Sequence, residues 1–234
     1  MYPYLYQSDL LRAFEINHAV ISCFDFDTSH FEHSLFNRLN IHHPDSMAQA
    51  TKKRQSEFLA GRYAAKESLK ALGITIHNTA IDENRAPIWP EDVVASITHN
   101  VGTAICAAAP NSQVKFLGID LEQIVDTETI HEIKPSIINT QEESLLRSSD
   151  LAFDTAFTLV FSAKESLFKA LYYYAGRYLD FDAAELSFIC TTTNSFGLTL
   201  TEDWSPEFQS GTPVHGRYHV NHDHVFTCVF EELA

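Results

Sequence analysis

The chain has 234 residues, of which 45% are hydrophobic and 20% charged, and its formal net charge is −15 at pH 7. This composition indicates a globular protein with a sizeable core. An acidic excess argues against a general nucleic-acid binder, because contacts to phosphates need surplus Lys and Arg. The first residues lack the pattern of a signal peptide, and no stretch reaches the ~20 apolar residues of a membrane-spanning helix. The four cysteines form no CxxC pair, so we expect free thiols in a cytoplasmic protein with no nucleic-acid or membrane partner.

The first predicted helix covers residues 50–72, where apolar residues recur at near-helical spacing up to a stop signal at Gly73. VVASITHN and GTAICAAA then predict two strands around a turn at residues 100–102. VKFLGIDLEQI predicts a third strand.

Residues 126–148 alternate charged residues with Ile and Leu, which predicts a helical region broken at Pro135. A strongly apolar helix over residues 151–174 follows and stops near Gly176. The C-terminal segments LSFIC, FGLTLT and GRYHVNHDHVFTCVF have the period of two that is typical of strands.

One phrase occurs twice, as AAKESLKAL at residues 64–72 and as SAKESLFKAL at residues 162–171. Chance is one explanation, because Ala, Lys, Glu and Leu are common helix formers. The shared order of helix and then strands instead indicates a duplicated α+β unit. We expect two halves, 1–112 and 113–234, each beginning with its AKESL helix and ending in a hairpin-like segment.

Carboxylates stand close together in GIDLE. On a strand, Asp120 and Glu122 point to one face while Ile119 and Leu121 point to the other. Two adjacent carboxylates favour a bound cation such as Mg²⁺, which takes one or two carboxylates plus phosphate oxygens. A solvated strand end with two unrelated acids is the alternative.

The helical segment FSAKESLFK carries further charges. Glu165 and Lys169 are four residues apart on one helix face, the spacing of an ordinary surface ion pair. If this face meets the GIDLE strand, Glu165 completes a three-acid metal site with Lys164 and Lys169 beside it, the outline of a phosphate site. The cluster KKR at residues 52–54, followed by Arg62 and Lys66, could bind a small polyanion.

Two histidine-containing segments allow different readings. SITHN places Thr98 on one strand face and His99 on the other, and a satisfied strand-end histidine is the alternative to a ligand contact. HVNHDH contains His219, His222 and His224, but no suitable further ligand is placed near them in the sequence. A zinc site is therefore not expected there.

Five segments taken in order resemble the 4′-phosphopantetheinyl transferases, in particular the bacterial type that accompanies siderophore synthetases. They are RQSEFLAGRYAAK (54–66), NRAPIWP (84–90), SITHN (96–100), GIDLE (118–122) and FSAKESLFK (161–169). The resemblance spans roughly residues 50–170, and SITH stands where the family has SISH. It implies an α+β pseudo-dimer of two similar α/β halves with coenzyme A in the cleft between them.

The implied reaction moves the phosphopantetheine arm of coenzyme A to a serine of an apo acyl, aryl or peptidyl carrier protein and releases adenosine 3′,5′-bisphosphate. The family's Mg²⁺ ligands match Asp120, Glu122 and Glu165, and Glu165 and Lys169 match catalytic positions together with Asp120. The positions implied to contact coenzyme A are Arg54, Arg62, Arg85, Thr98, His99, Lys164 and Lys169.

In this interpretation the first half holds the adenosine and 3′-phosphate, the second half holds Mg²⁺ and the catalytic residues, and the protein is a monomer. Two other functions remain open. One is a non-catalytic module that binds coenzyme A, and the other is a Mg²⁺-dependent hydrolase that releases phosphopantetheine into solution. Intact acids at positions 120, 122 and 165 argue against the simple binder, which need not retain them.

Overall fold

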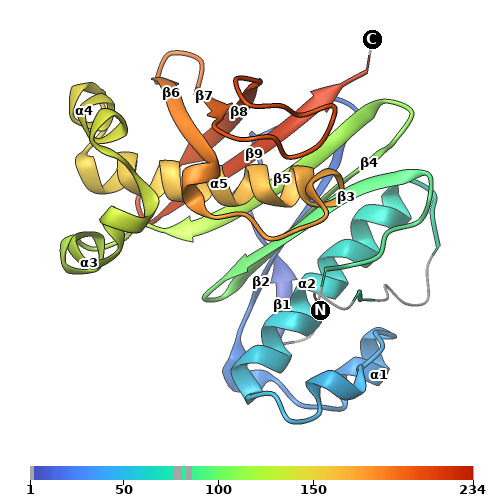
Figure 1. Ribbon diagram of the computed structural model, residues 1–234. Coiled ribbons are helices and arrows are strands. Elements are labelled where there is room, and N and C mark those ends of the chain that lie inside the picture. The colour runs from blue at the N-terminus through green and yellow to red at the C-terminus, as the bar shows by residue number, and fades with distance from the viewer. Residues whose placement is uncertain (1–2, 76–80, 83–85, 234) are drawn as a thin grey trace. The chain divides into compact units, whose positions relative to one another are not determined.

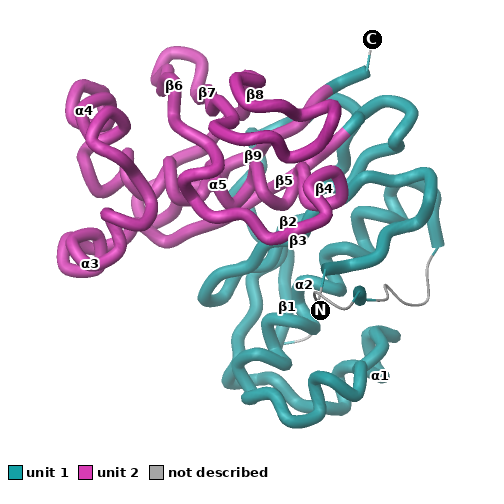
Figure 2. Tube along the Cα trace, in the orientation of Figure 1, with its two compact units in different colours: residues 1–115, 232–234 teal, residues 116–231 magenta. Residues whose placement is uncertain are grey.

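The structure is a computed structural model that describes residues 3–75, 81–82 and 86–233. The chain divides into two compact units, residues 1–115 with 232–234 and residues 116–231 (Figure 2). The boundary expected from the sequence lies between residues 112 and 113. Each unit combines one sheet with helices, so the prediction of an α+β fold is confirmed.

The first unit is built on a four-stranded sheet of order β1-β2-β4-β3. Its strands are β1 (Leu5–Gln7), β2 (Val20–Phe26), β3 (Val93–Asn100) and β4 (Thr103–Pro110). Its helices are α1 (Leu35–Leu39) and α2 (Lys52–Ala71). Helix α2 begins at a Thr51 cap, and its small residues Ala64 and Ala65 pack against Cys106 of β4. The predicted helix over residues 50–72 is confirmed.

Strand alternation sorts the SITHN segment as expected. Ile97 packs on the α2 side of the sheet, and His99 contacts Arg54 of α2. Thr98 and Ser96 are buried on the opposite face. The hairpin closes where Asn100 pairs with Thr103. Gly102 lies in that turn with φ +92°, a conformation that glycine adopts without a steric cost.

The second unit is built on a five-stranded sheet of order β5-β9-β8-β7-β6, and helix α5 lies across it (Figure 1). The helices are α3 (Thr127–Ile137), α4 (Thr140–Ser148) and α5 (Phe153–Ala175). The strands are β5 (Val114–Gln123), β6 (Ala184–Cys190), β7 (Ser195–Leu200), β8 (Pro213–Val220) and β9 (His224–Glu232). Apolar residues of α5, among them Phe157, Val160 and Leu167, form the core with the sheet.

The two units repeat one arrangement of strand, helix and hairpin. In the first, β2 precedes α2 and pairs with β4, the second strand of the β3–β4 hairpin. In the second, β5 precedes α5 and neighbours β9, the second strand of the β8–β9 hairpin. Each unit thus opens on a strand, so the expectation that each half begins with its AKESL helix is wrong.

Equivalent residues of the repeated phrase make equivalent hydrogen bonds. Lys66 donates to the carbonyl of Leu39, the last residue of α1, at 2.8 Å. Lys164 donates to the carbonyl of Ile137, the last residue of α3, at 2.7 Å. These matching contacts support duplication rather than chance as the origin of the repeat.

A second matching pair of bonds joins each helix to its sheet. Ser68 donates to the carbonyl of Cys106 in β4 at 3.0 Å, and Ser166 donates to the carbonyl of Thr227 in β9 at 3.1 Å. In both units, therefore, the serine of the AKESL phrase hydrogen-bonds the helix to the second strand of the hairpin.

Two further expectations need correction. Pro135 lies inside α3, and the helical region breaks instead at Ile138, because Asn139 caps α4 in a capping box with Glu142. Strands β1 and β2 and helix α1 occupy the first 50 residues, where no element was predicted. In VISCFDF four of the seven β2 residues are β-branched or aromatic, which is a strand signal.

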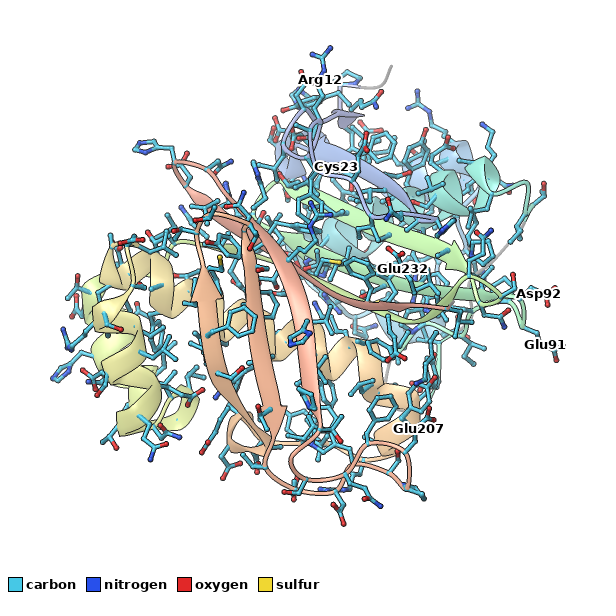
Figure 3. All side chains as sticks on the ribbon, turned by 90° about the horizontal axis from the view of Figure 1, so that it is seen from above. Arg12, Cys23, Glu91, Asp92, Glu207 and Glu232 are labelled. Atoms are coloured by element: carbon cyan, nitrogen blue, oxygen red, sulfur yellow. The ribbon has the colours of Figure 1, made fainter. Side chains whose placement is uncertain are left out.

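All four cysteines are free. Cys23 is buried within β2, whereas Glu91 and Asp92 are exposed in the turn before β3 (Figure 3). In the part of the chain that the structure describes, no helix has the length and apolar character needed to cross a membrane.

Candidate active site

Close packing of β5 against α5 brings the two charged motifs of the second unit together. Gly118 permits this approach, because a Cβ at that position would collide with the main chain of Ser166 and Ala170. Asp120 lies two residues further along β5, so its side chain points to the same α5 side. The glycine of GIDLE thus sets how close Asp120 comes to the helix.

Asp120 is the centre of the cluster and is buried, with a relative exposure of 3%. Its Oδ1 lies 2.6 Å from the ammonium Nζ of Lys169. Its Oδ2 accepts a hydrogen bond from Ser162 at 2.9 Å. Lys169 therefore forms an ion pair with Asp120 on the neighbouring strand β5. The alternative of an ordinary surface pair with Glu165 on the same helix does not account for this contact.

Glu122 and Glu165 complete the group of acids. The pKa of Glu122 is raised to about 7, first by burial of its carboxyl and then by the negative charge of Asp120. Lys169 opposes this rise, and Glu165 adds to it. Burial also raises the pKa of Glu165, against the effect of Lys169 and together with that of Asp120. The structure thus brings all three predicted acids and Lys169 into one electrostatic group.

The chemistry of these donors fits Mg²⁺. A cation among the carboxylates would relieve the repulsion that raises the pKa of Glu122, and Mg²⁺ takes one or two carboxylates while substrate phosphates and water fill its other positions. Within residues 3–75, 81–82 and 86–233, no group of three or more His, Cys, Asp or Glu side chains is already arranged to hold a metal ion. The three-carboxylate ligand set stays a prediction.

Lys164 occupies a different environment from Lys169. Its ammonium is buried, lies 2.9 Å from Glu142 Oε1 and donates to the Ile137 carbonyl at 2.7 Å. Burial lowers the pKa of Lys164, and the Glu142 carboxylate opposes that shift. In this structure Lys164 joins α5 to α3 and α4, whereas the sequence assigned it a phosphate contact.

Glu142 is a residue that the sequence reasoning missed. Its carboxylate also accepts main-chain hydrogen bonds from Leu186 of β6 at 2.8 Å and from Asn139 at 2.9 Å. The four-residue pattern NTQE could have identified it as a capping box, but not as the partner of Lys164.

A small pocket opens beside Glu165. Its wall includes the aromatic side chains of Phe168, Tyr178, Phe181 and Trp204. Phe168 and Tyr178 contact each other with ring centroids 5.4 Å apart. A group held in this pocket would lie beside Glu165, between aromatic walls and the charged residues Lys164 and Asp180.

The first unit holds the remaining predicted contacts with coenzyme A. Arg54 Nη1 lies 3.1 Å from His99 Nε2, so these two positions meet at the start of α2. Arg62 is buried and packs its guanidinium over the Phe58 ring, 5.0 Å from the centroid. Thr98 points to the other face of the sheet from His99. Arg85 lies outside the described residues.

Comparison with protein families matches both units. Residues 42–109 match the 4′-phosphopantetheinyl transferase N-terminal domain, and residues 116–229 match the 4′-phosphopantetheinyl transferase superfamily. The second match includes all of the acidic cluster on β5 and α5. It also includes Glu142 and most of β9.

Several known proteins are similar in sequence to this chain. Enterobactin synthase component D of Salmonella typhi is 40% identical over 147 residues, which are 62% of this chain and 59% of that protein. The protein of the same name from Escherichia coli K12 is also 40% identical over 147 residues, which are 68% of its length. The 4′-phosphopantetheinyl transferase Npt of Nocardia iowensis is 32% identical over 143 residues, 61% of this chain and 63% of that protein. The matched part of this chain therefore spans less than two thirds of the Salmonella relative.

Proposed function

Because this chain belongs to the 4′-phosphopantetheinyl transferase superfamily, we propose that it transfers 4′-phosphopantetheine from coenzyme A to a serine of an apo carrier protein. The observation that carries this proposal is the group formed by Asp120, Glu122, Glu165 and Lys169 on β5 and α5. Such a group suits a diphosphate, which needs both neutralisation of its charge and a base for the attacking hydroxyl.

Each residue has a role in this chemistry. Asp120, Glu122 and Glu165 would hold Mg²⁺, which when bound neutralises the diphosphate of coenzyme A and orients it. Lys169 holds Asp120 in place and offers its ammonium to the same negative charge. Glu165 is the proposed acceptor of the proton of the carrier serine.

The bonds balance without a covalent intermediate on the enzyme. The serine oxygen forms a bond to the phosphorus next to the pantetheine, and the bond from that phosphorus to the bridging oxygen breaks. Adenosine 3′,5′-bisphosphate leaves with that oxygen. Arg54 and His99 of the first unit are the proposed contacts for its 3′-phosphate, because Arg54 is exposed and already positioned by His99.

We infer the class of carrier from the relatives. Enterobactin synthase component D is the name of the proteins that match at 40% identity, so an aryl or peptidyl carrier domain of a siderophore synthetase is the first candidate. Acyl carrier proteins are the second.

The test pairs binding with transfer. Wild-type protein is incubated with coenzyme A, Mg²⁺ and an apo carrier domain, and the carrier is weighed by intact-mass spectrometry. We expect the mass of one phosphopantetheine on the carrier serine. The Glu165→Gln variant should bind coenzyme A in calorimetry yet lose orders of magnitude in kcat, because its amide cannot accept the proton.

Two outcomes would contradict the proposal. Tight binding of coenzyme A by the wild type with no modification of any carrier class would favour the non-catalytic binding module. Free phosphopantetheine appearing without a carrier would favour the hydrolase.

A further inference from the structure

Three buried hydroxyl groups connect α5 to β9 beneath Asp120. Ser162 and Ser166 lie one turn apart on α5, and Thr227 lies on β9; all three are fully buried. Thr227 Oγ1 lies 2.8 Å from Ser162 Oγ and 2.6 Å from Ser166 Oγ. Ser162 Oγ in turn donates to Asp120 Oδ2 at 2.9 Å. The hydroxyls therefore form a continuous chain that ends on the Asp120 carboxylate.

The direction of this chain follows from counting protons. In its ion pair with Lys169, the Asp120 carboxylate can only accept, so the single hydroxyl proton of Ser162 points to it. The bond between Ser162 and Thr227 must then use the proton of Thr227. That leaves Ser166 as the donor to Thr227 Oγ1, with its longer contact to the Thr227 carbonyl as a second branch. Every proton in the chain points toward Asp120.

The first unit supplies an internal comparison. There the serine of the AKESL phrase, Ser68, makes the same bond to the carbonyl of β4 at Cys106 that Ser166 makes to Thr227. At the positions equivalent to Ser162 and Thr227, however, the first unit has Ala64 and Cys106, and both are fully buried. The helix therefore packs on the hairpin strand without these two hydroxyls.

The hydroxyl of a helical serine has another available acceptor. It can bond back to the carbonyl four residues earlier in its own helix, which for Ser162 would turn the proton away from Asp120. A donor at Thr227 holds the Ser162 oxygen toward the sheet and strengthens the bond that Ser162 makes. Asp120 is then fixed through Oδ2, which leaves Oδ1 aimed at Lys169.

We propose that Thr227 and Ser162 are positioning residues that orient Asp120 through this polarised hydroxyl chain, and that the chain serves the acidic site rather than the packing of α5. This proposal rests on the proposed function, in which Asp120 holds Mg²⁺ beside the diphosphate of coenzyme A. Groups that hydrogen-bond to a metal-binding carboxylate orient it, and their removal typically lowers metal affinity by roughly 10- to 100-fold.

The test gives the second unit the residue types that the first unit has at the equivalent positions, Ala64 and Cys106. The variant Ser162→Ala/Thr227→Cys, in the full-length chain, should still fold, but at a lowered unfolding temperature because Asp120 Oδ2 loses its buried donor. Calorimetric titration of Mg²⁺ into the protein saturated with coenzyme A should show an affinity lowered by about 10-fold or more. The conservative variant Thr227→Ser keeps a hydroxyl donor and should retain the wild-type Mg²⁺ affinity.

Thr158→Val is the matched control. Thr158 is another fully buried hydroxyl on α5, but it bonds to Val125 and Asp154 and takes no part in the chain to Asp120. We expect it to lower the unfolding temperature while Mg²⁺ affinity stays unchanged.

Three results would overturn the proposal. One is wild-type Mg²⁺ affinity in a folded Ser162→Ala/Thr227→Cys variant, and another is an equal loss of affinity in Thr158→Val. Failure of the double variant to fold, while Thr227→Ser folds, would assign the hydroxyls to packing instead. A wild type that binds Mg²⁺ with coenzyme A but modifies no carrier contradicts the proposed function alone and leaves these comparisons valid.

Discussion

The buried pair of Lys164 and Glu142 allows a thermodynamic prediction. Replacing Lys164 by Met leaves a buried carboxylate without its cation, and replacing Glu142 by Gln leaves a buried ammonium without its anion. Each single variant should lower the free energy of unfolding by about 3–5 kcal/mol, the usual cost of one uncompensated charge in a protein interior.

The double variant Glu142→Gln/Lys164→Met should lose less than either single variant. No net charge remains buried at the pair, and the amide oxygen introduced at position 142 can still accept the hydrogen bond from the Leu186 N–H. The Asn139 N–H then faces the amide nitrogen in place of Oε2, and the Ile137 carbonyl loses its donor Lys164, so a cost of about 1–3 kcal/mol remains.

Urea unfolding of the four proteins measures this cycle, provided that the slope m stays constant. If the two single losses simply add in the double variant, the pair is not coupled and the reasoning is refuted. The double variant should also keep the wild-type KM for coenzyme A. A raised KM for coenzyme A in a stable double variant would indicate that Lys164 contacts a phosphate of coenzyme A, as the sequence suggested.

Three other perturbations test the remaining assignments. Arg54→Ala should raise the KM for coenzyme A by about 10-fold, weaken the preference for coenzyme A over 3′-dephospho-coenzyme A and leave kcat unchanged. The neighbouring Lys53→Ala should change neither this KM nor this preference. An unchanged preference in Arg54→Ala would show that Arg54 does not contact the 3′-phosphate. Gly118→Ala should cost about 3 kcal/mol or more in urea unfolding, because its Cβ meets the main chain of Ser166, and near-wild-type stability would contradict the close packing of β5 on α5. Chelation should abolish transfer and Mg²⁺ should restore it for the wild type but not for Asp120→Ala, so full activity in excess chelator would disprove the metal assignment.

Short-range patterns in the sequence were reliable where one element decides the outcome. Alternation along a strand placed Asp120 and Glu122 on one side of β5, and the stop signals at Gly73 and Gly176 matched the ends of α2 and α5. The repeated AKESL phrase indicated two similar halves. For the strand face and the stop signals the information lies within about ten residues, the range over which backbone geometry relates side chains to one another.

The partners of the charged and polar side chains could not be predicted in the same way. Local spacing pairs Lys169 with Glu165, whereas the structure pairs it with Asp120 on another element. Lys164 is next to Glu165 in sequence, yet its ammonium is buried against Glu142.

By itself, then, the sequence determined most of the helices and strands after residue 50, the strand face that carries Asp120 and Glu122, and the family to which the motifs point. Only the tertiary structure decided which faces meet. It pairs Lys169 with Asp120 and Lys164 with Glu142, and it places the Thr227 hydroxyl of β9 within hydrogen-bond distance of Ser162. The physical reason is that a buried charge or hydroxyl is costly unless it has a partner. That partner is whichever group the packing of distant segments brings within hydrogen-bond distance.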